Sequence, residues 1–91
     1  MEIKYTKHFL NRLEDIFSET DYNLRYEKGR FQSGYCILKD NKIAIVNKYY
    51  SLDGKINSLL EILKQIDLDT SKLSEKNQKL FHDINQTQLS F

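Results

Sequence analysis

The side chains best suited to nucleophilic or imidazole chemistry in this sequence are Cys36, His8 and His82. A cysteine becomes a nucleophile when a nearby base or cation stabilises its thiolate. Cys36 lies instead in the apolar stretch Tyr35–Leu38, which favours a buried structural cysteine. Neither histidine has a second histidine four positions away, the spacing with which one helix face binds zinc. These residues therefore predict neither a nucleophile nor a metal centre.

Phosphate-binding loops and paired catalytic carboxylates are not indicated either. A phosphate-binding loop requires clustered glycines, whereas the three glycines, Gly29, Gly34 and Gly54, are widely spaced. The acidic residues are scattered along the chain rather than grouped as the pair that a glycosidase uses. We therefore expect no enzymatic activity and no cofactor.

The segment Phe31–Lys64 resembles the hairpin and following helix of the ImmA/IrrE-type zinc metallopeptidases. In that family a strand of the pattern I-x-I-N leads through a helix start of the pattern L-S-x-x-x-K into the zinc-binding sequence H-E-x-x-H. Here Ile43–Asn47 matches the strand and Ser51–Ile56 matches the helix start. The order of helix, hairpin and helix also resembles that of small uncharacterised bacterial proteins.

The zinc-binding positions of that family are not kept here. H-E-x-x-H aligns with Leu60-Glu61-Ile62-Leu63-Lys64. Glu61 keeps the carboxylate of the general base, but a leucine has no lone pair to donate and a lysine ammonium repels zinc. The resemblance therefore implies a degenerate, inactive peptidase-like domain. In it Glu61 is a vestigial motif position with Lys64 as its helix neighbour, and Leu60 is a core residue.

Basic residues are concentrated in the middle of the chain, although the whole protein has a net charge of only +1. Residues 22–48 contain six basic and two acidic residues, a net charge of +4, between two mildly acidic segments. Basic and aromatic side chains together on a sheet can hold phosphates and stack bases. The candidate basic surface comprises Arg25, Lys28, Arg30, Lys39, Lys42 and Lys48.

The elements that must position these residues begin with a helix and a strand. An apolar stripe with helical spacing covers residues 9–17, and Thr6 is placed to cap the helix N-terminus. Residues 22–27 alternate with period two, so that Tyr22, Leu24 and Tyr26 share one face of a strand. The helical stripe consists of Phe9, Leu10, Leu13, Ile16 and Phe17.

A β-hairpin is the clearest local prediction. The runs Ser33–Lys39 and Lys42–Lys48 are rich in residues typical of strands. They flank Asp40 and Asn41, which tolerate the positive φ angles of a two-residue turn. The register that follows pairs Lys39 with Lys42, Leu38 with Ile43, and Cys36 with Ile45.

Both faces of this hairpin are apolar at their centres. We expect one face to pack against helices and the other to be covered by the first or last helix, by a second copy or by a partner protein. The face assigned to the helices comprises Cys36, Leu38, Ile43 and Ile45. The face assigned to a partner comprises Tyr35, Ile37, Ala44 and Val46.

Two helices are predicted after the hairpin. Ser51 is placed to cap the first, and apolar residues recur with helical spacing from Ile56 to Ile66. A second stripe, within residues 73–84, predicts a last helix that Thr70 or Ser74 could cap. Residues 86–91 are expected to form a flexible tail.

The chain is predicted to be a single α+β domain spanning residues 1–91. It should contain an N-terminal helix, a three-stranded antiparallel sheet and two C-terminal helices. No apolar run approaches the roughly 18 residues of a membrane span, and Met1–Tyr5 lacks the apolar segment of a signal peptide. With a single cysteine, the chain is expected to be a bacterial cytoplasmic protein that does not bind a membrane.

The expected function is that of a non-catalytic protein-interaction or self-associating module, acting as a homodimer or bound to a protein partner. The alternative is a small nucleic-acid-binding protein that uses the basic segment 25–48. The first interpretation depends on the doubly apolar hairpin, and the second on the basic residues of the strands.

Overall fold

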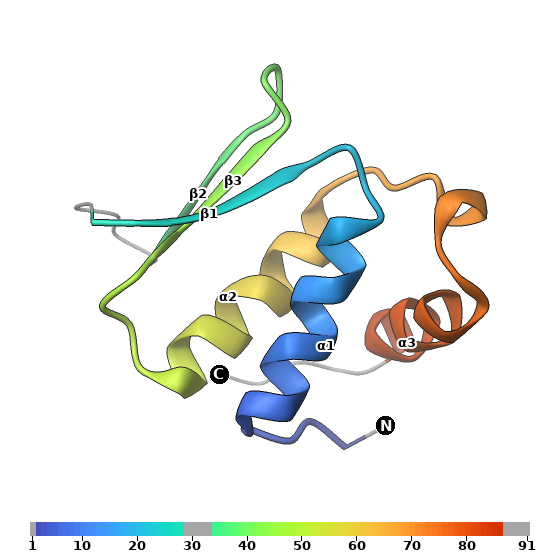
Figure 1. The fold of residues 1–91 in the computed structure, drawn as a ribbon, viewed down its shortest axis with the longest axis horizontal. Coiled ribbons are helices and arrows are strands. Elements are labelled where there is room, and N and C mark those ends of the chain that lie inside the picture. Colours follow the sequence, from blue (N-terminus) through green and yellow to red (C-terminus); the bar gives the residue numbers. More distant parts are fainter. Residues whose placement is uncertain (1, 29–33, 87–91) are drawn as a thin grey trace.

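The computed structural model describes residues 2–28 and 34–86 of the chain. Figure 1 shows an α+β fold in which a helix and three strands are followed by two helices, the predicted order. A short 3-10 helix, η1 (Thr70–Lys72), precedes the last α-helix. The other elements are α1 (Lys7–Ser18), β1 (Asn23–Glu27), β2 (Tyr35–Leu38), β3 (Ile43–Asn47), α2 (Leu52–Gln65) and α3 (Glu75–Gln86).

The helices begin at the predicted caps. The side-chain oxygen of Thr6 accepts a hydrogen bond from the backbone N–H of Phe9, and that of Ser51 accepts one from Gly54. Such bonds satisfy N–H groups that have no partner within the helix. Ser74 caps α3 in the same way, at the backbone N–H of Asn77. The apolar stripes of α1 and α2 are buried as predicted.

The sheet is mixed rather than antiparallel throughout. Its strand order is β1-β3-β2, in which β1 pairs with β3 in parallel and β2 pairs with β3 in antiparallel orientation. The prediction of a fully antiparallel sheet was therefore wrong for β1. The central position belongs to β3, whose Ala44 and Val46 are fully buried. This order places Leu24 and Tyr26 of β1 beside those two residues.

The hairpin keeps its predicted register but not its predicted turn. Cys36 lies opposite Ile45, as expected. A two-residue turn would need positive φ angles at its central residues. Among the described non-glycine residues, however, the only positive φ belongs to Lys42, at 53°. The connection is a four-residue loop over 39–42, closed by a hydrogen bond from the backbone N–H of Lys42 to the carbonyl oxygen of Lys39.

The assignment of the two hairpin faces was wrong. Ala44 and Val46 are fully buried, and Tyr35 and Ile37 pack against the same core. Paired residues of neighbouring strands share a face, so that Leu24 and Tyr26 bring this side of the sheet onto the helices. The four residues proposed as a partner surface, Tyr35, Ile37, Ala44 and Val46, therefore line the interior.

The helices cover a single face of the sheet, as Figure 1 shows. The helix α1 packs against β1, the helix α2 packs against β3, and the two helices pack against each other. The last helix, α3, contacts α1. The hydrophobic core lies between the sheet and these helices. In the part of the chain that the structure describes, no helix is long and apolar enough to cross a membrane.

Two glycines make room for the ring of Tyr50 in the loop between β3 and α2. A Cβ atom added to Gly54 would lie 2.7 Å from Cδ2 of Tyr50, and one added to Gly34 would overlap the far side of the same ring. Gly34 also has a φ angle of 82°, a conformation that glycine adopts more readily than other residues. The Tyr50 ring thus joins the beginning of β2 to the first turn of α2.

A buried amide anchors α3 to α1. Asn77 is 1% exposed, and its Nδ2 donates hydrogen bonds to Asp15 Oδ2 at 2.9 Å and to Glu19 Oε1 at 2.7 Å. The same oxygen of Glu19 accepts a bond from the backbone N–H of Ser74. These bonds hold the pKa of Glu19 below its ordinary value, chiefly through Ser74 and then through Asn77.

Candidate functional site on the outer face of the sheet

The outer face of the sheet is the side that the helices leave uncovered. On β1 the side chains of Asn23, Arg25 and Glu27 alternate with the inward Leu24 and Tyr26. Strand pairing then defines the rest of this face on β2 and β3. The outer face comprises Asn23, Arg25, Glu27, Cys36, Leu38, Ile43, Ile45 and Asn47.

The centre of the outer face is apolar. Ile45 lies opposite Cys36, and Ile43 lies opposite Leu38. Leu38 is 40% exposed, and the other three side chains are partly exposed. Cys36 was predicted to be buried in the core and is instead part of this open face. Adjacent exposed apolar residues on a small domain are typical of an interaction surface.

One edge of the outer face is charged. Arg25 is the register partner of Ile45, so that a guanidinium group borders the apolar centre. Arg25 Nε lies 3.0 Å from Glu27 Oε2, and both side chains are more than one third exposed. A pair that is this exposed contributes little to stability, so both groups are available for a partner at small cost.

The six residues of the predicted basic surface do not form one cluster. Lys39 and Lys42 lie in the loop between β2 and β3, whereas Lys28 and Lys48 lie at the opposite end of the sheet. Lys42 Nζ is 2.7 Å from Asp21 Oδ2, and this hydrogen bond raises the pKa of Lys42 and lowers that of Asp21. Arg30 lies outside the described residues.

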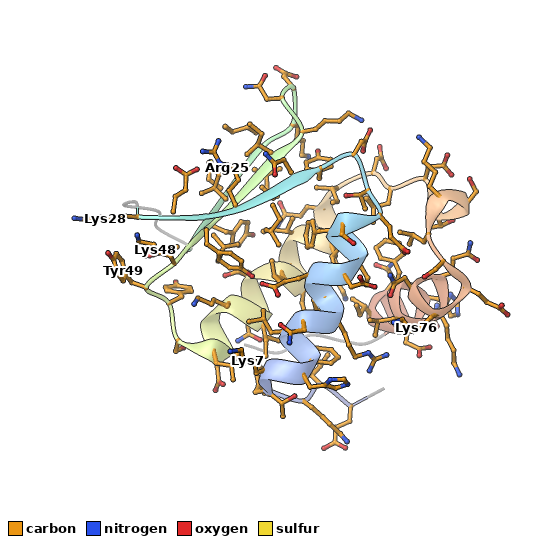
Figure 2. The ribbon with its side chains drawn as sticks, viewed as in Figure 1. Lys7, Arg25, Lys28, Lys48, Tyr49 and Lys76 are labelled. Carbon is orange, nitrogen blue, oxygen red and sulfur yellow. The ribbon has the colours of Figure 1, made fainter. Side chains whose placement is uncertain are left out.

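A smaller basic and aromatic group forms at the carboxyl ends of β1 and β3. Figure 2 shows Lys28, Lys48 and Tyr49 together at that end of the sheet, with Arg25 further along β1. Lys48 Nζ lies 5.2 Å from the centroid of the Tyr49 ring, which is 69% exposed. A cation over an exposed ring offers both a charge and a stacking surface.

The remaining polar groups under the sheet are structural. The hydroxyl of Tyr26 donates a hydrogen bond to Glu14 Oε2 at 2.5 Å. Burial, and then this bond, raise the pKa of Tyr26 far above its ordinary value, so that the phenol stays protonated. Lys55 Nζ lies 5.6 Å from the centroid of the same ring. This group therefore joins β1 to α1 and α2.

The positions aligned with H-E-x-x-H lie on α2. Leu60 is fully buried, as predicted for a core residue, Glu61 is partly buried and Lys64 is exposed. Both histidines are exposed. Within residues 2–28 and 34–86, no group of three or more histidine, cysteine or carboxylate side chains is placed to hold a metal ion.

The outer face could have been found from the sequence with one further step. Residues 35–38 and 43–46 are apolar on both faces, so their own periodicity cannot choose between them. The alternation in β1, with polar Asn23, Arg25 and Glu27 on one side, indicates which face of the sheet is exposed to solvent. Because β1 pairs with β3, the hairpin residues on the same side as these three polar residues are the exposed ones.

Comparison with protein-family models, with curated proteins and with solved structures found no match.

Proposed function

We propose that this protein is a non-catalytic interaction module that binds a partner protein through the outer face of its sheet. The observation that carries the proposal is the row of apolar side chains around Leu38, on a face that no described helix covers. Leu60 and Lys64 offer no zinc ligand at the aligned positions. If the chain is related to the metallopeptidases, this supports the interpretation that it has lost their activity.

The chemistry of this face specifies the partner. Protein interfaces combine an apolar centre with a polar rim, and matching charges select the partner. Arg25 and Glu27 lie on the outer face itself, and the strands together with the residues that directly follow them carry four cations against two anions, Glu27 and Asp40, when the ion pair of Lys42 with Asp21 is left out. The partner should therefore present apolar side chains that are flanked by carboxylates. These cations are Arg25, Lys28, Lys39 and Lys48.

A displayed library of random peptides and small protein domains tests the proposal. The wild-type protein is the bait, and every binder is measured again against Ile45→Lys and against Asn11→Lys, a matched change at an exposed position of α1. We expect the binders to be rich in apolar and acidic residues and to lose binding to Ile45→Lys alone. Binders without acidic enrichment, or with equal affinity for both variants, would contradict the proposal.

A second candidate function is the binding of single-stranded nucleic acid. It is favoured by the contact of Lys48 with the exposed ring of Tyr49, beside Lys28. Bases could stack on Tyr49 while the lysines hold phosphates. Fluorescence anisotropy with labelled oligo(dT) and oligo(U) should then show affinity that falls steeply with salt and is lost in Tyr49→Ala. Binding that depends neither on salt nor on Tyr49, or no binding at low salt, would contradict this candidate.

A further inference from the structure

β2 has one edge that is not paired with a described strand. The backbone N–H of Asn47 donates to the carbonyl oxygen of Gly34 at 2.8 Å. Hydrogen-bonded and non-hydrogen-bonded pairs alternate along an antiparallel ladder, so that Cys36 and Leu38 also bond to β3. The backbone groups of Tyr35 and Ile37 therefore point away from β3, toward the open edge.

Charge distinguishes this edge from the other edge of the sheet. β2 contains no charged residue, whereas β1 contains Arg25 and Glu27. In a symmetric pair of strands, the residue on the two-fold axis meets its own copy. Two copies of β1 centred on Arg25 would place like charges opposite each other, which is destabilising. The edge of β2 carries no such penalty, and it lacks the charges that usually protect an edge strand.

We propose that β2 pairs in antiparallel orientation with β2 of a second copy of this chain, with the two-fold axis at Cys36. In this register Tyr35 of each copy exchanges its backbone hydrogen bonds with Ile37 of the other. Every outward backbone group of these two residues is then satisfied. The inference goes beyond the proposed function, because edge pairing leaves the outer face open and joins two such faces into one larger surface.

The side chains around this edge fit the pairing. Tyr35 and Ile37 are only partly buried against their own core, because α2 packs mainly against β3. In the dimer each would cover the other across the strands. The strand is short, so the contact is smaller than the roughly 800 Å² per partner of a standard interface. The dimer should accordingly dissociate in the micromolar range or above.

A charge placed on the axis tests the proposal. Sedimentation equilibrium from low micromolar to millimolar concentration should show a dimer for the wild type. Cys36→Lys should weaken it at least tenfold, since the two ammonium groups meet. Leu38→Lys puts the same charge on the same face, but its two copies lie roughly 13 Å apart and are screened by salt. The dissociation constant of the dimer should therefore rise less than threefold. Mixing Cys36→Lys with Cys36→Glu should restore association.

A cross-link tests the register independently. Two copper(II)–phenanthroline complexes each accept one of the two electrons that are released when two thiols lose their protons and form a disulfide. This oxidant should couple Cys36 to its copy rapidly. The variant Cys36→Ser with Leu38→Cys presents a more exposed thiol away from the axis and should react slowly. A monomeric wild type at millimolar concentration, equal weakening by both lysines, or equal cross-linking of both thiols would overturn the proposal. Ile45→Lys should leave the dimer intact, so that a failure of partner binding can be distinguished from a failure of dimer formation.

Discussion

Arg25 and Ile45 are register partners in the parallel pair of β1 and β3, which brings a guanidinium group to the border of an exposed apolar surface. Neither residue faces the helices. The neighbouring position in each strand, Tyr26 or Val46, does so instead. A shift of one residue along β3 thus separates the outer face of the sheet from the core.

This alternation predicts opposite outcomes for lysine at adjacent positions. Val46→Lys buries an unpaired charge and should lower the free energy of unfolding by about 3 kcal/mol or more. Ile45→Lys leaves its charge in solvent and should lower it by less than about 1 kcal/mol. Urea denaturation followed by circular dichroism measures both values. Similar losses for the two variants would show that the faces are assigned wrongly.

The buried amide of Asn77 predicts a specific loss when it is removed. Asn77→Ala removes the amide donor that the carboxylates of Asp15 and Glu19 share and should lower the free energy of unfolding by about 1–3 kcal/mol. Lys79→Ala, at an exposed position of α3, is the matched control and should change it by less than about 0.5 kcal/mol. Equal effects of the two substitutions in thermal or urea unfolding would show that the Asn77 amide does not anchor α3 to α1.

The lowered pKa of Glu19 predicts how stability depends on pH. Its carboxylate has an ordinary pKa of 4.5 and is held lower in the fold by Ser74 and Asn77. The ionised group therefore stabilises the fold above that ordinary pKa, and this contribution disappears as the pH falls through the folded pKa. Urea midpoints taken from about pH 6 to pH 3 should fall more steeply for the wild type than for Glu19→Gln. Asp40→Asn, in the loop between β2 and β3, should follow the wild type.

Because Tyr50 packs on Gly54, the effect of Gly54→Ala on the free energy of unfolding should change when the Tyr50 ring is removed. Replacing a helical glycine with alanine ordinarily stabilises a protein by about 0.5–1 kcal/mol. Here the new methyl group would meet the Tyr50 ring, so Gly54→Ala alone should be neutral or destabilising. In a Tyr50→Ala background the same change should stabilise. An identical effect in both backgrounds would mean that the ring does not constrain the glycine.

Local patterns in the sequence were sufficient for the helices, their caps at Thr6 and Ser51, and the pairing of Cys36 with Ile45. They were not sufficient for the neighbour of β1, because β1 and β3 are not consecutive strands and no turn sets their register. Asn77 could not be predicted as a buried residue either, since its partner Asp15 is 62 positions away in the sequence. The outer face proposed as a binding surface follows from the sheet order rather than from the hairpin alone.

The most direct test of the outer face as a binding surface compares three baits in a lysate of the source cell: the wild type, Ile45→Lys and Asn11→Lys. Nuclease is present throughout, and bound proteins are quantified by mass spectrometry. We expect a stoichiometric protein that the wild type and Asn11→Lys retain equally, and that Ile45→Lys retains at least tenfold less. Equal retention on all three baits, or no protein retained by the wild type, would contradict the assignment of the outer face as the binding surface.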